Sequence, residues 1–339
     1  MLQLIGGIVL RRLVGAVPVM LVVSIVVFIV LRMLPADPIG MMLPPNATAA
    51  DAAALRAAFG LDKPLPEQYG LWLAGALHGD LGISIHFHER VVGLIAAALP
   101  ATVELALAAL VLAVAIGIPG GLLLHAVRSR QGAIAANFAV SALLSVPSFL
   151  WAILLIVLFG VTFPVLPFTG RVSGGVALPG WTGFALIDTL AAGHLRDFLD
   201  AAEHLLLPAL ALALGFAPLV MRVLRSSLMD AAAEDYVTTA RLRGVSEGRI
   251  LVHHMLKNAA LPTVTLIGVQ FGFLFGGTLL VELIYSFPGL GNLMVQAVRD
   301  HDLPLLQGVA VVFCAAVLLA NTLVDALYVV LNPRLRRAR

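Results

Sequence analysis

Six long apolar runs constrain this chain more than any other feature of its sequence. None contains a charged residue, and each is about as long as, or longer than, the ~17–25 residues that a helix needs to cross a bilayer. They cover residues 13–31, 105–124, 133–163, 205–221, 258–281 and 303–324. Because 60% of the residues are apolar and only 12% are charged, polar groups cannot cover the apolar surface in water. The sequence therefore predicts an all-α integral membrane protein with six transmembrane helices.

The distribution of Lys and Arg predicts how these helices are oriented. With six alternating spans, fourteen of the 21 basic residues lie on the side of the two termini and seven on the other side. Basic residues are enriched on the cytoplasmic side of a membrane, so both termini are expected in the cytoplasm. The first apolar run is longer than the ~7–15 residues of a signal-peptide core, which favours a retained span in the cytoplasmic (inner) membrane. The positive charge follows this topology and forms no single patch, so nucleic acid is not an expected partner.

The segment between the first two spans is expected to form a small external cap. It contains two short helical patterns between Pro-rich breakers. The first begins at Thr48, which is an N-cap candidate with Asp51 three residues later. The second has Pro66 and Glu67 in its first turn.

The segment between spans four and five is the longest charged insert on the cytoplasmic side. Ser227 and Asp230 have capping-box spacing, which predicts a helix that continues through Arg243 and ends at Gly244. Ser246 is expected to cap a second helix after this turn.

One face of the first loop helix offers two functional interpretations. Tyr236, Ala240 and Arg243 share a face by their helical spacing, and the small Ala240 would let a neighbour approach closely. Such a helix could dock in the groove of a partner protein, or it could lie on anionic lipid headgroups. The spacing alone leaves both interpretations open.

Several motifs, in order along nearly the whole chain, resemble the permeases of the dipeptide/oligopeptide/nickel family of ABC importers. They include FGLDKPLPEQYGLWL, GDLGIS, LPATVELAL, DYVTTARLRGVS followed by HHMLKNAALP, FPGLGNL and DALYVVLNPRLR. The resemblance implies a fold like that of a type I ABC importer permease. It also implies residues 1–98 as first span plus cap, 99–333 as the permease domain with a coupling loop at 225–260, and 334–339 as a cytoplasmic tail.

The resemblance also implies partners and a docking segment. The expected partners are a second homologous permease, two cytoplasmic ATPase subunits and an external substrate-binding protein. The residues expected to couple to the ATPase are Asp235, Tyr236, Thr239, Ala240, Arg243 and Gly244. Glu234 does not occupy the position of the Glu found in the general permease motif. The substrate implied is a di- or oligopeptide, with a nickel or other metal chelate, or glutathione, as alternatives.

The absence of nucleotide-binding and catalytic motifs assigns ATP hydrolysis to another chain. The two lysines, Lys63 and Lys257, follow Asp62 and Leu256, so neither belongs to a Gly-Lys-Ser/Thr phosphate loop. ATP and Mg²⁺ are therefore expected on partner subunits, with no cofactor and no enzymatic activity in this chain. A secondary transporter is a less favoured alternative, because no matching halves are visible.

Three polar features have both a functional and a structural interpretation. Glu104 and Glu282 lie in or beside apolar spans, where acids are costly, so they could line a translocation path or gate, or form structural pairs. His86 and His88 could hold a metal if extended, but without a clear third ligand a polar external loop is favoured. No metal site is therefore predicted.

Overall fold

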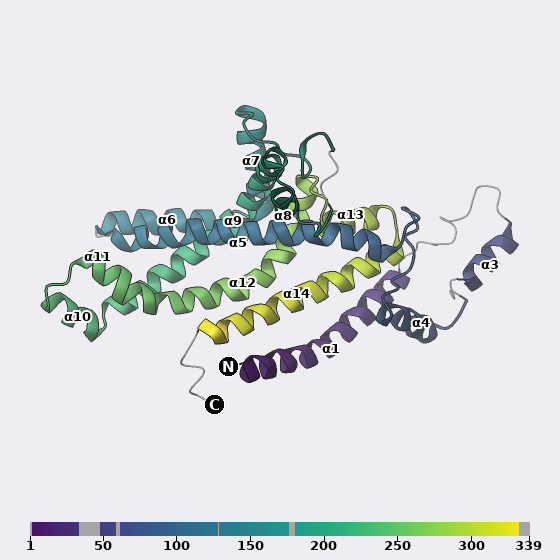
Figure 1. Ribbon diagram of the computed structural model, residues 1–339, viewed down its shortest axis with the longest axis horizontal. Helices are drawn as coiled ribbons and strands as arrows, with labels where there is room; N and C mark the ends of the chain where they lie inside the picture. Colours follow the sequence, from purple (N-terminus) through teal and green to yellow (C-terminus); the bar gives the residue numbers. More distant parts are fainter. Residues whose placement is uncertain (1, 34–47, 59–61, 128, 176–179, 332–339) are drawn as a thin grey trace.

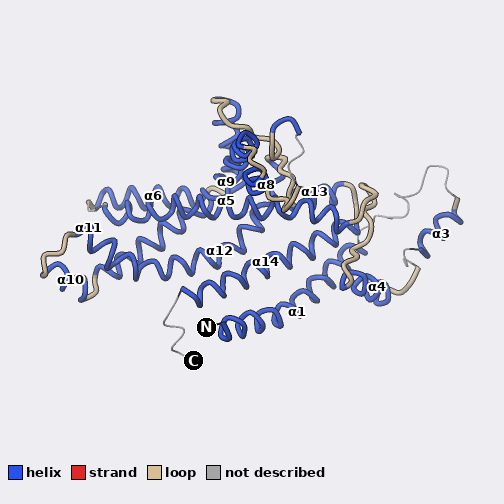
Figure 2. Tube along the Cα trace, viewed as in Figure 1, coloured by secondary structure: helices blue, strands red, loops and turns tan. Residues whose placement is uncertain are grey.

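The computed structural model describes residues 2–33, 48–58, 62–127, 129–175 and 180–331 (Figure 1). Figure 2 shows that these ranges are mainly helical, with loops between the helices. The one β pairing among the described residues is an isolated bridge between Ile83 and Arg90. The all-α prediction is confirmed. The expected tail, residues 334–339, lies outside the described residues.

Five helices of the described chain are long and apolar enough to cross a membrane as single elements. They are α1 (Leu2–Met33), α5 (Val91–Ala126), α9 (Leu195–Ala232), α12 (Leu256–Ile284) and α14 (Leu303–Leu331). Each contains one of the predicted apolar runs and extends beyond it. The expected domain boundary at residue 98 falls inside α5, which begins at Val91.

The predicted third span, residues 133–163, is broken into two helices. It consists of α6 (Arg130–Ser145) and α7 (Ser148–Leu155), which continues as the π-helical η1 (Ile156–Thr162). The two halves are bent by 93°. Pro147 lacks an amide hydrogen and forces the residue before it out of helical geometry, and Val146 accordingly has φ −90° and ψ 115°. The structure therefore has six spans only if this bent pair crosses the membrane together.

The centre of the bundle is the contact between α5 and α9, the most extensive contact between two helices. Small residues let the two backbones approach, and Ala109, Ala113, Ala213 and Ala217 are fully buried between them and their neighbours. A Cβ atom on Gly117 of α5 would lie 2.7 Å from Val220 Cβ on α9. Outside this pair, α12 packs on α9, α14 on α12 and α1 on α14.

The segment expected to form the cap contains the two predicted helices, α3 (Ala49–Ala58) and α4 (Leu65–Leu77), which confirms both. Thr48 and Asp51 form the expected reciprocal cap: Asp51 Oδ2 accepts from the Thr48 amide at 2.8 Å, and Thr48 Oγ1 accepts from the Asp51 amide at 3.2 Å. α4 rests on α1, because Tyr69 Oη lies 2.9 Å from Ser24 Oγ.

Most of the short helices lie toward the two ends of the bundle (Figure 1). At one end lie α10 (Asp235–Leu242), α11 (Glu247–Arg249) and the π-helical η3 (Ile250–Met255), which leads into α12. Toward the other end lie α4 and α13 (Leu290–Arg299), and α8 (Ala185–Ala191) and η2 (Ser173–Gly175) belong to the loop before α9. The start of α1 and the end of α14 point toward the α10 end (Figure 1).

Candidate functional site

The loop between α9 and α12 contains a short helix that ends at a tight turn. α10 follows Glu234, and Gly244 has φ +75°, the left-handed conformation expected of a glycine after a helix. The amide of Val245 donates to the Ala240 carbonyl at 3.2 Å and so closes the turn. The predicted helix start at Ser227 is wrong. Ser227 lies within α9, which runs on to Ala232 because its apolar residues Leu224 and Leu228 remain buried.

The face of α10 predicted for docking is divided between the interior and the surface. Ala240 is 7% exposed, and it packs with Val237 against Leu228, Ile250 and Met255. Ala240 is therefore part of the protein's own core, and the neighbours that its small side chain admits closely belong to this chain. Helical spacing correctly placed Ala240 on one face of α10 with Tyr236 and Arg243. The sequence could not show that α9 and η3 cover the Ala240 side of this helix.

The exposed side of α10 and its turn is apolar and basic. Leu242 is 85% exposed, Tyr236 is 36% exposed, and Arg243 is also exposed. Tyr236 Oη accepts a hydrogen bond from Asn258 Nδ2 at 3.1 Å, which fixes the ring against the start of α12. Thr239 and Asp235 are exposed as well. Five of the six predicted coupling residues, all except Ala240, thus lie at the surface of one projecting helix and its turn.

An exposed ion pair joins the two sides of the turn. Arg241 Nε lies 2.7 Å from Glu247 Oε1, and this neighbouring carboxylate raises the pKa of the Arg241 guanidinium. A solvent-exposed pair of this kind contributes little to stability. Its effect is to hold the start of α11 beside α10.

A cavity of about 230 Å³ lies at the break between α6 and α7. It is lined by Pro147 and Ser148 at the break, by Gly215 of α9, and by Gln270 and Gly277 of α12, among mostly apolar residues. The Gln270 amide makes no hydrogen bond to any described residue. A Cβ on Gly215 or Gly277 would come into van der Waals contact with Ser148 or Leu212. This break cavity, defined by Pro147, Ser148, Gly215, Gln270 and Gly277, combines apolar walls with a few polar groups, as ligand pockets do.

Glu104 is held in a structural ion pair. Its carboxylate lies 2.6 Å from Arg171 Nη2 and accepts the amide of Leu186 at 2.8 Å, at the start of α8. Arg171 also donates to the Gly183 carbonyl at 2.8 Å. The side chain is buried, and its oxygens are directed at the loop before α9. This geometry supports the structural alternative over an open position in a path.

Glu282 is fully buried and caps a helix that follows it. Its carboxylate accepts from Thr102 Oγ1 at 2.8 Å and from the amides of Gly291 and Asn292 at 2.7 and 3.1 Å, at the start of α13. Thr102 Oγ1 in turn accepts the amide of Leu290 at 2.7 Å. The carboxylate therefore ties α5, α12 and α13 together, which again supports the structural alternative.

His86 and His88, the two histidines considered as metal ligands, do not converge on a metal. His86 Nε2 lies 3.7 Å from Asp300 Oδ2, and the ring of His88 folds back to the His86 carbonyl at 3.1 Å. Among the described residues, no three His, Cys, Asp or Glu side chains are placed to bind one ion.

Sequence reasoning missed the residues of the break cavity. Pro147 in the middle of an apolar run was the available signal for a break. Ser148 and Gln270 gave none, because single uncharged polar residues are common in spans and only the fold brings these two together.

Comparisons with known proteins agree with this architecture. The family model "Binding-protein-dependent transport system inner membrane component" matches residues 117–337, and a companion model for the N-terminal part of such components matches residues 1–106. The chain is 39% identical to the dipeptide transport system permease protein DppB of Escherichia coli K12, with 98% of this chain and 99% of DppB covered. It is 35% identical to the glutathione transport system permease protein GsiC of Escherichia coli O6:H1, with 97% and 98% covered.

A solved structure shows the same fold at low sequence identity. A chain of the MetNI methionine ABC transporter, in an inward-facing conformation, superposes with a TM-score of 0.53 at 16% identity. The match covers 70% of this chain and 96% of that one.

Proposed function

Because the chain belongs to the family of binding-protein-dependent transport system inner membrane components, we propose that it is the permease subunit of an ATP-driven importer of short peptides. The observation that carries this proposal is the near-complete match to a dipeptide permease at 39% identity. Under the proposal, both termini and α10 lie in the cytoplasm, and the cap segment faces outside.

The proposed assembly contains a second related permease, two cytoplasmic ATPase subunits and an external substrate-binding protein. In this assembly ATP and Mg²⁺ would bind to the ATPase subunits, and ATP hydrolysis would take place there. The exposed Tyr236, Leu242 and Arg243 would form the docking surface for one ATPase, with an apolar anchor and a guanidinium as is common at interfaces.

The packing of α10 supplies a route from the ATPase to the membrane. Val237 and Ala240 are locked against α9 and η3, so a displacement of α10 is transmitted to these elements rather than absorbed in a loop. α9 and α12 also line the break cavity. We propose that ATP-driven movement of α10 changes the access of this cavity from outside to inside, and that peptides pass through it by alternating access.

Glutathione transport is a second candidate, supported by the 35% identity to GsiC. Uptake of a labelled dipeptide, measured with an excess of either unlabelled dipeptide or glutathione, separates the two. Strong competition by glutathione alone would favour the second candidate.

The docking surface is tested with a charge placed on α10. Leu242→Glu should abolish retention of the ATPase during purification and reduce peptide uptake at least tenfold, because a carboxylate would enter an apolar contact. Leu77→Glu is a matched control, since Leu77 is 79% exposed on the cap segment at the other end. Unchanged retention and uptake in Leu242→Glu would contradict the docking role of α10.

Orientation is tested separately with reporters. A topology reporter inserted at Ser246 should read cytoplasmic, and one near Asn46 should read external. The opposite result would remove the ATPase from reach of α10.

A further inference from the structure

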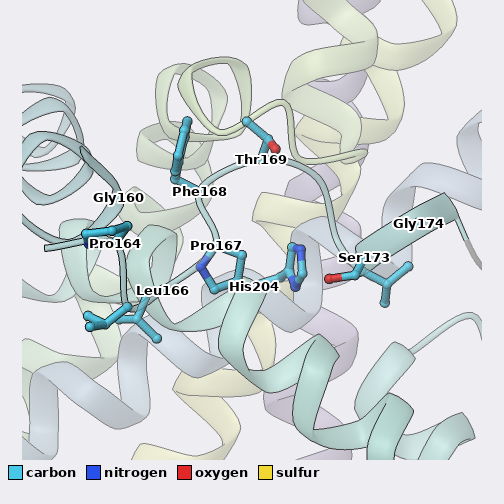
Figure 3. Close-up of a pocket in the computed structure, with 11 residues that line it drawn as sticks. Gly160, Pro164, Leu166, Pro167, Phe168, Thr169, Ser173, Gly174 and His204 are labelled. Carbon is cyan, nitrogen blue, oxygen red and sulfur yellow. The ribbon is translucent and has the colours of Figure 1, made fainter. Parts of the chain in front are cut away.

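A second cavity, of about 570 Å³, lies beside the loop that leads from η1 to η2 (Figure 3). One side is mainly apolar and consists of Gly160 and loop residues that include Pro164, Pro167 and Phe168. The other side is polar and includes Ser173 and His204. We call this cavity, with the residues named here, the loop pocket. Its volume is in the range of small-molecule sites.

His204 is a buried polar group whose ring faces the loop pocket. The residue is only 5% exposed, yet Figure 3 shows its ring pointing between Pro167 and Ser173. Its Nδ1 lies 2.8 Å from the Asp200 carbonyl, and because a carbonyl oxygen can only accept, Nδ1 carries a hydrogen. Nε2 makes no hydrogen bond to any described residue. A neutral His204 thus presents a free acceptor to the pocket.

The charge beside His204 is negative. Asp200 Oδ1 lies 3.5 Å from His204 Nδ1, and the carboxylate is held by the Ser173 amide at 2.7 Å and the Ser173 hydroxyl at 2.6 Å. No lysine or arginine lines the pocket, and the nearby Arg171 is already paired with Glu104. A ligand that donates hydrogen bonds or carries positive charge fits this edge, while an apolar body fits the proline and phenylalanine side.

We infer that the loop pocket binds the amino-terminal end of a short peptide, with the ammonium group at His204 Nε2 and an apolar first side chain against Phe168 and Pro167. This inference rests on the proposed function and names the part of the substrate that this chain recognises. The position fits a first stop on the path, because α7 and η1 run from Ser148 in the break cavity to Gly160 in the loop pocket.

The test measures binding of the dipeptide 4-fluorophenylalanyl-alanine to the assembled importer in nanodiscs without its binding protein. Fluorine NMR line broadening gives the affinity. His204→Phe keeps a ring but removes the acceptor, so it should weaken binding at least fivefold. N-acetylation of the dipeptide, which removes the ammonium, should weaken binding to the wild type to the same degree.

His194→Phe is the matched control. His194 is the residue before α9, the helix that contains His204, and its side chain is exposed, so this variant should leave binding unchanged. Equal affinities of wild type and His204→Phe, or of the free and acetylated dipeptide, would overturn the inference. If His204→Phe does not assemble, Phe168→Ser replaces it, because the Phe168 side chain is 37% exposed and lies on the apolar wall. That variant should weaken binding at least threefold, and an unchanged affinity would likewise overturn the inference.

Uptake by the wild-type importer in cells separates this inference from the proposed function. Uptake of the dipeptide with binding insensitive to His204 would reject the loop pocket alone. An absence of uptake of any peptide would reject the proposed function itself.

Discussion

The helices α1 and α9 are both predicted spans, but they occupy opposite positions in the molecule. α1 is the more apolar, with a mean hydropathy of 3.0 over its best window against 2.0 for α9. Yet only 11% of that window is buried in α1, against 67% in α9. In a membrane, apolarity therefore indicates that a helix can face lipid and does not indicate that it lies at the centre.

The difference follows from side-chain size. α1 carries branched residues that point outward, such as Val14 and Val22, which are 64% and 60% exposed. α9 carries alanines that are fully buried, including Ala211, Ala213 and Ala217. Since lipid tails are as apolar as leucine, burying a large apolar side chain against protein brings little gain, and close backbone packing of small residues decides which helices form the core.

The largest effect should come from the buried carboxylate of Glu282, which caps α13 where α5, α12 and α13 meet. Glu282→Ala would leave the Thr102 hydroxyl and the amides of Gly291 and Asn292 without their acceptor in the interior. We expect a loss of roughly 3–5 kcal/mol in unfolding free energy. Thermal unfolding in detergent measures it, with Asp51→Ala, which removes the exposed cap of α3, as a control that should barely shift the midpoint. Equal shifts of the unfolding midpoint in Glu282→Ala and Asp51→Ala would mean that the buried cap stabilises the protein no more than the exposed one.

A leucine in the helix contact should have the next largest effect. Gly117→Leu would clash with Val220 and the Ala217 carbonyl, at a cost of about 1–3 kcal/mol. Gly15→Leu in α1 adds the same side chain where no atom lies within 4 Å, so it should leave stability unchanged. The same unfolding assay compares the two variants. Tolerance of both would mean that α5 and α9 are not closely packed.

Two glycines near α10 test backbone conformation alone, because an alanine side chain at either position would contact no other residue. A Cβ on Gly244 or Gly248 would meet no atom within 4 Å, but only Gly244 has positive φ. Gly244→Ala should destabilise by about 1 kcal/mol, whereas Gly248→Ala, in α11, should be neutral or stabilising. Hydrogen exchange of residues 235–249 measures the local effect, and shifts of the same sign would refute the assigned turn.

The smallest expected effect is a loss of stability of α3 at low pH, caused by protonation of Asp51 in its exposed N-terminal cap. Hydrogen bonds from the Thr48 amide and hydroxyl hold the pKa of Asp51 below its ordinary value of 3.8. A lowered folded pKa means that the cap stabilises α3 above pH 3.8 and that this contribution is lost as pH falls through the folded pKa. Hydrogen exchange of residues 49–58 should therefore accelerate in acid beyond its intrinsic change. Asp51→Asn should not show this acceleration, and identical pH profiles would exclude the cap as its cause.

The predictions that succeeded depend on local chemistry. Long uncharged runs identified the spans, because a charge in lipid is costly wherever the helix packs. Thr48 with Asp51 marked the start of α3, and Gly244 marked the turn after α10, because caps and turns involve residues close in sequence. The family motifs, read in order, indicated the permease fold that the comparisons support.

The tertiary structure decided everything that depends on which segments meet. Glu104 forms an ion pair with Arg171, which is 67 residues away in the sequence. Glu282 accepts a hydrogen bond from Thr102, which is 180 residues away in the sequence. Ala240 turned inward because α9 and η3 lie on that side, and His204 faces a pocket because residues 164–174 lie against it. The sequence by itself determined that the chain is a bundle of membrane helices with a projecting loop helix. Packing of small residues, which hydropathy does not register, determined that α5 and α9 form its centre.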